Sequence, residues 1–402
     1  MLNWIKKFNI FCFLDNNEYE HTDPSFEWVA AVGATNSISI NSFSDIQKIS
    51  DFHLAYPGWL FGHFNYPSQQ KDYIDFPAAF FYKPQMIIRS VGNSIQISSD
   101  TFSLHSIHDE INAQSSEIIA EQKKNISVQC RTSKEEYLET ISHLKKHIQR
   151  GDCYEINYCI DFFAENTSID PYYLFHCLSA ISPNPFSAFY RLEDKYCICA
   201  SPERFLKKTG NTLYSQPIKG TAKRIPADTA ADQKSKEHLF ESHKERAENV
   251  MVVDLVRNDM SRVCKPGSVF VNELFGIYSF PQVHQMISTI QGTVDENIPW
   301  VKIIEACYPM GSMTGAPKIK VLELIEKYES APRGLFSGTI GYVTPDGNFD
   351  FNVVIRSMFY NNSLQRLSFK AGSGITFNSN AEQEYDECMA KASALMKILS
   401  EN

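Results

Sequence analysis

The sequence has no long apolar run, no basic tract and no paired cysteine motif, and each absence excludes a class of protein. Its 402 residues contain no stretch approaching the roughly 18 consecutive apolar residues of a spanning helix, so no membrane segment is expected. With 47 Asp and Glu against 38 Lys and Arg, the net charge is −9, which disfavours a nucleic acid partner. The 10 cysteines show neither CxxC pairs nor a zinc pattern, which favours a reduced cytoplasmic location over a disulfide framework.

The order of predicted strands and helices favours the α+β class. Residues 1–125 contain short alternating runs such as "SIQISS", and they are expected to form a β-rich region packed on a core of residues 126–402. Within that core, the segments that indicate strands are "YEINYCIDFFA", "FSAFYRL", "YCICAS", "RFLKKT" and "TLYSQPI". Because short turns join consecutive strands and helices stand in separate blocks, mainly antiparallel sheets are predicted.

Two helix starts carry a capping box, in which a Ser hydroxyl and a Glu three residues later each bond the other's backbone N–H. The two pairs are Ser133 with Glu136 and Ser379 with Glu382. A polar loop is expected over 222–238, followed by a helix over about 239–257.

Two pairs of glutamates could bind a metal ion. Glu245 and Glu248 lie three residues apart on one predicted helix, and Glu384 and Glu387 repeat the spacing on the last helix, so each pair points to one side. Two such pairs facing each other would bind a hard cation such as Mg²⁺ through oxygen. For any one of these residues alone, solvated helix charge is the simpler interpretation.

Two glycine-rich segments are suited to binding an anion. In "YPMGSMTGAPKIK", a loop of small residues leads into a helix start at Pro317, which offers free backbone N–H groups and the positive end of the helix dipole. In "KAGSGITF", Gly372 and Gly374 follow a strand and allow backbone amides to approach a ligand closely. An ordinary turn and a β-bulge are the alternative interpretations.

Arg356 alternates with apolar residues in "VVIRSMF", a strand expected to be largely buried. A buried guanidinium needs an acidic partner, and a ligand carboxylate would bind it through two parallel hydrogen bonds. A structural salt bridge is an equal alternative.

Lys219 in "QPIKGT" and Glu203 in "ASPERF" are separated by a predicted turn and strand. A hairpin could bring them to one cleft and place an acid or base beside an amine. Because lysine is nucleophilic only when neutral, such a site is expected to lower the pKa of Lys219 by burial or by a nearby cation. Taken alone, Lys219 is typical of a surface lysine.

Together and in this order, the motifs resemble those of the chorismate-utilising enzymes, which are the anthranilate, isochorismate, salicylate and aminodeoxychorismate synthases. The resemblance rests on "GDCYEINYC", "ASPERF", "PIKGT", "RAENVMVVDLVRND", "YPMGSMTGAPKIKVLELIE", "IGY", "VIRS", "AGSGI" and "EYDECMAKA". It implies two stacked, mainly antiparallel β-sheets wrapped by helices, with the active site in the cleft between them.

The resemblance also implies roles for single residues. Glu248 and Glu387 would face Mg²⁺, with Glu245 and Glu384 supporting it, and the metal ion would hold the ring carboxylate of chorismate. Glu203 would be the general acid or base at the departing C4 hydroxyl. The positions implied at the substrate are Gly220, Thr221, Thr314, Gly315, Arg356, Gly372, Ser373, Gly374 and Lys391.

The lysine of "PIKGT" is similar to that of the aminodeoxychorismate synthases, where it attacks ring carbon 2, whereas anthranilate synthases usually carry Ala there. This implies amination of chorismate at C4 for 4-aminobenzoate and folate synthesis. The sequence shows no cysteine motif of a glutaminase, so a separate glutamine amidotransferase subunit is expected to supply ammonia. The alternatives are an anthranilate synthase component I and a non-catalytic chorismate-binding paralogue.

Two further positions bear on the reaction. The isochorismate and salicylate enzymes carry a water-activating lysine in the segment corresponding to "GDCYEINYC", where this chain has Glu155 or Asn157, so water is disfavoured as nucleophile. Family members commonly carry His where this chain has Gln285, with His284 one residue earlier. Gln can form hydrogen bonds but cannot shuttle a proton at neutral pH. Either that position is not essential for amination or His284 substitutes for it.

Overall fold

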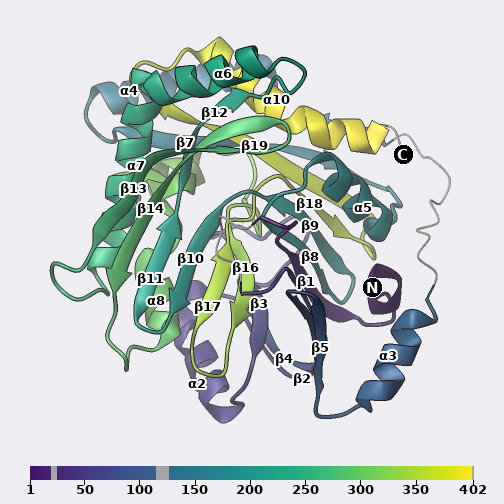
Figure 1. The fold of residues 1–402 in the computed structure, drawn as a ribbon. Coiled ribbons are helices and arrows are strands. Elements are labelled where there is room, and N and C mark those ends of the chain that lie inside the picture. The colour runs from purple at the N-terminus through teal and green to yellow at the C-terminus, as the bar shows by residue number, and fades with distance from the viewer. Residues whose placement is uncertain (20–24, 115–125, 401–402) are drawn as a thin grey trace.

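Two antiparallel sheets, continuous with each other through the long strand β4, make up the body of the molecule (Figure 1). The computed structural model describes residues 1–19, 25–114 and 126–400. Every strand pair among these residues is antiparallel, which confirms the predicted α+β class with antiparallel sheets. The proposed division of the chain at residue 125 falls at the edge of 115–125, outside the described residues.

The first sheet includes the strand predicted at "YEINYCIDFFA". In spatial order it consists of β5 (Ser94–Ser99), β4 (Ala79–Val91), β2 (Trp28–Ile40), β1 (Ile10–Asp15), β8 (Phe186–Leu192), β9 (Lys195–Ser201), β18 (Ser357–Asn361), β19 (Arg366–Thr376) and β7 (Glu155–Ala164). The short strands β6 (Gln129–Cys130) and β15 (Gly315–Ala316) pair with the other edge of β7.

The second sheet continues from β4. Its further strands are β3 (Leu60–Phe64), β16 (Thr339–Val343), β17 (Phe349–Asn352), β10 (Arg204–Thr209), then β11 (Thr212–Gln216) and β12 (Ile218–Lys223) end to end, β14 (Val283–Thr293) and β13 (Phe270–Ser279). Pro217 separates β11 from β12 because proline has no N–H to donate to the ladder.

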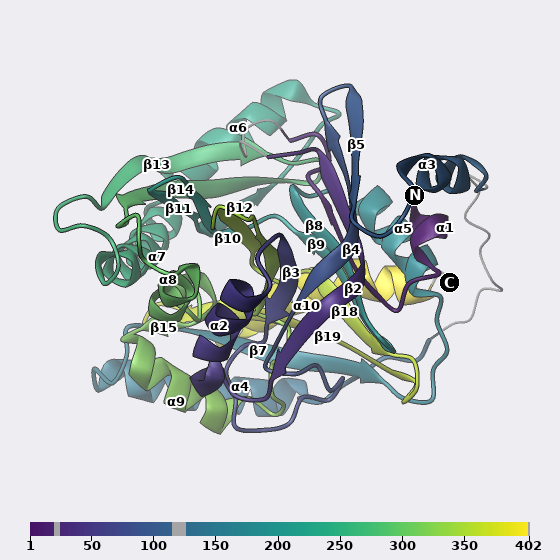
Figure 2. The same cartoon turned by 90° about the horizontal axis from the view of Figure 1, so that it is seen from below.

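Helices pack against both sheets (Figures 1 and 2). Against the first sheet pack α4 (Lys134–Gln149), α5 (Pro171–Ile181) and α10 (Ala381–Ser400), and against the second pack α6 (Thr229–Glu241) and α7 (His243–Ser261). The remaining helices are α1 (Leu2–Ile5), α2 (Gln47–Ala55), α3 (Leu104–Asn112), α8 (Trp300–Cys307), α9 (Lys318–Tyr328) and the 3₁₀ turns η2 (Phe43–Asp45) and η3 (Gly311–Met313). No helix in the described part of the chain is long and apolar enough to span a membrane.

The central strands of the first sheet are buried on both faces, unlike the exposed edge strand β5. On β9, Cys197 and Cys199 face the apolar cluster that lies between the sheets, whereas Tyr196, Ile198 and Ala200 face the cluster under α4, α5 and α10. This alternation follows from the two-residue period of a strand. It explains the apolar composition of "YCICAS" and confirms its prediction as a strand with two buried thiols, and all 10 cysteines are free.

Local chemistry explains where the helices begin, and it corrects two predictions. The capping box of Ser133 and Glu136 is present at α4. The predicted box of Ser379 and Glu382 is wrong, because the side chain of Asn380 accepts from the first amides of α10 and the Ser379 hydroxyl instead accepts from the N–H of Thr376.

The loop predicted over 222–238 is also wrong over its second half, where α6 begins. The carboxylate of Asp228 accepts hydrogen bonds from the N–H groups of Ala230 and Ala231 and caps the helix. Leu239 is its one buried side chain, and it packs with Phe275 and Met286. A helix with a single buried residue gives almost no periodic pattern in sequence, so it was missed.

The chain passes from one sheet to the other at two adjacent points. Between β9 and β10 it crosses at Glu203, and between β17 and β18 it crosses near Arg356. Backbone hydrogen bonds join the two crossings, from the N–H of Val353 to the carbonyl of Glu203 and from the N–H of Ala200 to the carbonyl of Arg356. Both residues therefore lie at the junction of the two sheets.

Arg333 ties three segments together beside this junction. Its buried guanidinium donates to the carboxylate of Glu329 at 2.6 and 2.9 Å, to the carbonyl of Met313 at 2.6 Å and to the carbonyl of Asn157 at 2.8 Å. These bonds connect the end of α9, the η3 turn and β7.

Replacing Arg333 by Met should therefore lower the free energy of unfolding by about 3–5 kcal/mol, because the carboxylate of Glu329 would remain buried without its partner. Urea denaturation at neutral pH measures the change. The matched control is Lys320→Met on the exposed face of α9, where the ion pair with Glu323 is solvated and little change is expected. Equal losses in the two variants would contradict this account of Arg333.

Candidate active site

The amine of Lys219 crosses the cleft between the sheets. Lys219 lies on β12 of the second sheet, and its Nζ donates a hydrogen bond of 2.7 Å to Oε1 of Glu155 on β7 of the first sheet. The same Nζ lies 3.7 Å from Oε2 of Glu248 on α7. The amine also lies over Gly374 on β19, because a Cβ at that glycine would come within 2.1 Å of Nζ. Lys219 is therefore a cleft residue and not a surface lysine.

The charges around Lys219 correct the expected direction of its pKa. Burial alone lowers the pKa of the amine, but the carboxylates of Glu155 and Glu248 outweigh it and raise the pKa above the ordinary lysine value. The expectation of a lowered pKa was wrong, because sequence did not reveal two carboxylates facing one amine. Lys219 is thus held as an ammonium and must lose a proton before it can act as a nucleophile.

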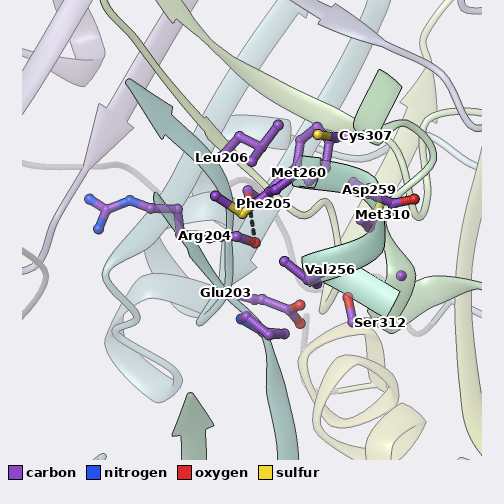
Figure 3. Close-up of a pocket in the computed structure, with 13 residues that line it drawn as sticks. Glu203, Arg204, Phe205, Leu206, Val256, Asp259, Met260, Cys307, Met310 and Ser312 are labelled. Atoms are coloured by element: carbon purple, nitrogen blue, oxygen red, sulfur yellow. Dashed lines mark hydrogen bonds between the residues drawn. The ribbon is translucent and has the colours of Figure 1, made fainter. Parts of the chain in front are cut away.

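Glu203 faces the same junction from the first crossing (Figure 3). Only 4% of the residue is exposed. Burial raises the pKa of Glu203 to about 7, although the nearby Ser312 hydroxyl and Ile218 N–H and the charges of Lys219 and Arg356 act to lower it. A carboxyl with this pKa can both donate and accept a proton at neutral pH, as a general acid or base must.

Figure 3 shows a narrow cavity behind Glu203. Glu203 and Ser312 lie at one end of it, and the side chains of Leu206, Met260 and Cys307 line the other end. The apolar lining surrounds Glu203 on the side away from Lys219 and explains why its ionised form is disfavoured.

Arg356 has no carboxylate partner within the described ranges of the chain. Its backbone is in the left-handed region, with φ of 51°, which turns the side chain at the second crossing. Burial lowers the pKa of the guanidinium, while the nearby charge of Glu203 raises it. The interpretation of Arg356 as a structural salt bridge therefore lacks an acidic partner among the described residues. A guanidinium with free N–H donors is instead suited to bind a ligand carboxylate.

The four glutamates lie on two helices that approach each other at the cleft. Glu248 and Glu384 are buried, Glu245 is partly buried, and the side chain of Glu387 is 48% exposed. Burial raises the pKa of Glu245, and the charges of Glu387 and Glu384 raise it further. Burial likewise raises the pKa of Glu248 to about 7, with additional repulsion from Glu245 and Glu155. Mutual repulsion of this kind is relieved when a cation binds.

Lysines hold some of these carboxylates. The carboxylate of Glu387 forms an ion pair with the amine of Lys391 at 2.6 Å. The amines of Lys219 and Lys244 lie 3.7 and 3.9 Å from the carboxylate of Glu248. As the side chains lie, no three acidic, His or Cys groups in the described residues form a ligand cluster. The donor set of hard carboxylate oxygens nevertheless fits Mg²⁺, since it carries unrelieved negative charge on two facing helices.

The remaining predicted positions on β12 and at η3 differ in what their side chains contact. Gly220 lies against Glu245, with a virtual Cβ 3.3 Å from that residue's Cβ, and Thr221 is exposed. The hydroxyl of Thr314 donates to the carbonyls of its own turn, at Met310 and Gly311. At Gly315 a Cβ would lie 2.0 Å from the Glu155 carbonyl, so the glycine lets β7 approach.

The positions on β19 and α10 divide between the cleft and the outer core. Gly374 lies beneath Lys219, as described above. The Ser373 hydroxyl bonds Tyr137 at 3.3 Å on the helix-covered face, away from Lys219. The Nζ of Lys391 donates to the carbonyl of Gly372 at 2.9 Å and links α10 to the sheet.

His284 and Gln285 point to opposite faces of β14. The ring nitrogens of His284 bond the Ser279 hydroxyl at 2.9 Å and the Asp232 carboxylate at 3.2 Å, beneath α6. Gln285 is buried beside Thr221, and its Oε1 has no partner among the described residues. Of the two, Gln285 is therefore the one with hydrogen-bonding capacity left for a ligand.

Glu155 has no role in the predictions from sequence, although the structure places it against Lys219. The available signal was an acidic residue that begins a strand whose other members are mostly apolar. Ser312, whose hydroxyl acts to lower the pKa of Glu203, was noted only as part of a polar loop. Glu203 lies 109 positions earlier in the chain (312 − 203), and no local pattern records their proximity.

The raised pKa of Glu203 predicts how pH affects stability. A carboxyl whose pKa is raised on folding stabilises the fold most below its ordinary pKa of 4.5, and that stabilisation is lost as pH rises through about 7. The side chain of Glu203→Gln does not titrate. The free energy of unfolding of this variant minus that of the wild type should therefore rise by about 2–3 kcal/mol from pH 5 to pH 8. Urea denaturation at both pH values without added metal measures this gain. The exposed Glu323→Gln should show none, and a Glu203→Gln difference that does not vary with pH would contradict the assigned pKa.

Comparison with known proteins shows the family to which this chain belongs. A model of the chorismate binding enzymes matches residues 14–397. The aminodeoxychorismate synthase component 1 of Escherichia coli (strain K12) is 38% identical over 271 residues, which are 67% of this chain and 59% of that protein. The chain thus spans less than two thirds of that relative's length. The anthranilate synthase component I-like protein of Synechocystis sp. is 30% identical over 373 residues, 90% of this chain and 76% of that protein.

Solved structures share the fold at lower identity. Anthranilate synthase component I from Streptococcus pneumoniae TIGR4 gives a TM-score of 0.79 at 22% identity, covering 92% of this chain and 91% of that one. The menaquinone-specific isochorismate synthase from Escherichia coli gives 0.80 at 17% identity, covering 99% and 90%. These likenesses show the fold, which agrees with the two facing antiparallel sheets expected from the motifs. Because the family model matches almost the whole chain, the protein belongs to the chorismate binding enzymes.

Proposed function

We propose that this chain converts chorismate and ammonia to 4-amino-4-deoxychorismate through a covalent bond to Lys219. The relatives named aminodeoxychorismate synthase component 1 support the reaction, among them those of Escherichia coli and Bacillus subtilis at 38% and 35% identity. The single observation that carries the proposal is the amine of Lys219, held in the cleft by Glu155 and facing the same junction as Glu203.

The reaction divides into two substitutions. In the first, Nζ of Lys219 bonds ring carbon 2 while the C4–O bond breaks. Glu203, with a pKa of about 7, gives a proton to the departing hydroxyl, which leaves as water. The proton lost by the attacking amine balances the proton that Glu203 gives. In the second, ammonia bonds C4 and expels the lysine, so one hard substitution becomes two easier ones.

Groups of positive charge would hold the two carboxylates of chorismate. The free guanidinium of Arg356 is suited to bind one of them through two hydrogen bonds. Glu248 and Glu387, supported by Glu245 and Glu384, would hold Mg²⁺, which supplies positive charge for the ring carboxylate. Without that charge, four glutamates would repel an anionic substrate. Backbone amides at Gly372, Ser373 and Gly374, with Thr314, would complete the contacts.

Ammonia would come from a separate glutamine amidotransferase subunit. The word "component" in the names of the relatives implies a partner subunit for them. For this chain the partner is part of the proposal, as is its place in 4-aminobenzoate and folate synthesis. Glu155 or Asn157 in place of a lysine in "GDCYEINYC" is consistent with ammonia, and not water, as the nucleophile.

Product identification tests the proposal directly. With chorismate, Mg²⁺ and ammonium at high pH, where free ammonia is abundant, the wild-type chain alone should form 4-amino-4-deoxychorismate. Lys219→Ala should lower the rate at least about 100-fold, because the covalent route is lost. Chromatography with mass detection measures the products. Lys223→Ala, an exposed lysine on the same strand, is the matched control and should keep the wild-type rate.

Two outcomes of the same assay would count against the proposal. An undiminished rate in Lys219→Ala would exclude the covalent role. Anthranilate as the main wild-type product would favour the alternative suggested by the Synechocystis relative, whose printed name is anthranilate synthase component I-like.

A further inference from the structure

The backbone of Glu155 is held by a neighbouring strand on each side. Glu155 begins β7, where its backbone pairs with Thr376 of β19 on one side and with Ala316 of β15 on the other. Only 3% of the residue is exposed. Gly315 lies directly against Glu155, because a Cβ at position 315 would come within 2.0 Å of the Glu155 carbonyl. Position 315 therefore has no room for a side chain. The backbone therefore aims the side chain of Glu155 into the cleft.

The carboxylate of Glu155 accepts one hydrogen bond among the described residues. Its Oε1 accepts the 2.7 Å hydrogen bond from Nζ of Lys219, and its Oε2 is buried without a hydrogen-bond partner in the described part of the chain. Both atoms of the contact lie over Gly374, where a Cβ would meet Nζ at 2.1 Å and Oε1 at 2.9 Å. A side chain at position 374 would displace the pair.

Two other buried carboxylates of this protein accept hydrogen bonds at both oxygens. Both oxygens of Glu329 accept hydrogen bonds, from Arg333 and from the N–H of Cys159. Both oxygens of Asp161 accept from described side chains as well. A carboxylate that serves only to stabilise a fold is expected to resemble these, because an unpaired buried acceptor is costly. Glu155 departs from that pattern at the reacting amine.

Two carboxylates compete for the amine of Lys219. Glu155 holds it at 2.7 Å, within hydrogen-bond range, whereas Glu248 lies at 3.7 Å on the helix that carries the glutamate pair. Without the charge of Glu155, the amine would be drawn toward Glu248 and away from Gly374. The backbone of Lys219 stays fixed in either case, since its carbonyl accepts a 3.2 Å hydrogen bond from Asn249.

We propose that Glu155 is the positioning residue for the reacting amine of Lys219, holding Nζ over Gly374 and apart from Glu248. The inference rests on the proposed function of Lys219 as nucleophile. It assigns Glu155 no contact with the substrate and no part in the covalent step. Its effect is on where the amine stands when the substrate arrives, and a displacement of about 1 Å can cost 100-fold in rate.

Kinetics of Glu155→Gln and Glu155→Asp test the assignment, with Glu329→Gln as the matched buried carboxylate. Gln keeps the shape but not the charge, and Asp keeps the charge but falls short by one methylene. Both variants should lower kcat of ammonium-dependent amination by about 100-fold while KM for chorismate changes less than about threefold. Glu329→Gln should lower the melting temperature, with kcat reduced far less.

A second measurement does not depend on the reaction. In protein with isotope-labelled lysines, the side-chain ammonium NMR signal of Lys219, identified by its loss in Lys219→Met, should be present in the wild type and in Glu329→Gln. It should shift or disappear in Glu155→Gln, because the hydrogen bond that immobilises the amine is gone.

The outcomes separate the two proposals. If the wild type makes no 4-amino-4-deoxychorismate, the proposed function fails, and the NMR signal still decides whether Glu155 holds the amine. If the wild type is active and Glu155→Gln keeps kcat within about threefold, the positioning role is overturned. An unchanged Lys219 signal in Glu155→Gln also overturns it. The role is likewise overturned if Glu155→Gln lowers the melting temperature as much as Glu329→Gln does and changes kcat and KM together. Should Glu155→Gln fail to fold, Glu155→Asp carries the same comparisons.

Discussion

The hydrogen bond between Lys219 and Glu155 joins the two sheets at the point where the chemistry is proposed, and the rest of the site depends on it. Lys219 belongs to the second sheet and Glu155 to the first, so their 2.7 Å contact fixes the distance between β12 and β7. The contact needs a glycine at 374, because a Cβ there would come within 2.1 Å of Nζ and 2.9 Å of Oε1. The ion pair thus explains one small residue of the "AGSGI" motif.

Charge in the cleft is arranged in two groups, and this arrangement decides the protonation of each residue. On one side the carboxylates of Glu155 and Glu248 flank the amine of Lys219 and keep it protonated. On the other, Glu203 is buried behind an apolar wall and is close to half-protonated at neutral pH. An amine and an acid whose environments push their pKa values in these directions are suited to a reaction that needs a nucleophile and a proton donor together. A cation at the glutamates would lower the repulsion within the first group.

Much of the fold could be predicted from local pattern, because alternation and capping are recorded in neighbouring residues. The strands β7 to β11 and the start of α4 are examples. The helix α6 could not, since only Leu239 of its residues is buried and its cap is a single aspartate. The candidate residues Lys219, Glu203 and the four glutamates were identified, yet the pKa direction of Lys219 was wrong. That direction depends on Glu155, 64 residues away, and on the way in which two sheets meet. A sequence without related sequences beside it does not record such a contact.

The central claim is that the Lys219 amine forms a bond to chorismate, and intact-protein mass spectrometry tests it most directly. The wild-type chain would be incubated with chorismate and Mg²⁺ in the absence of ammonia, quenched in acid and mapped by peptide digestion. The account predicts a mass gain of one chorismate less one water, confined to the peptide that carries Lys219. A wild-type protein that aminates chorismate when ammonia is added, but shows no adduct or carries it on another residue, would contradict the account.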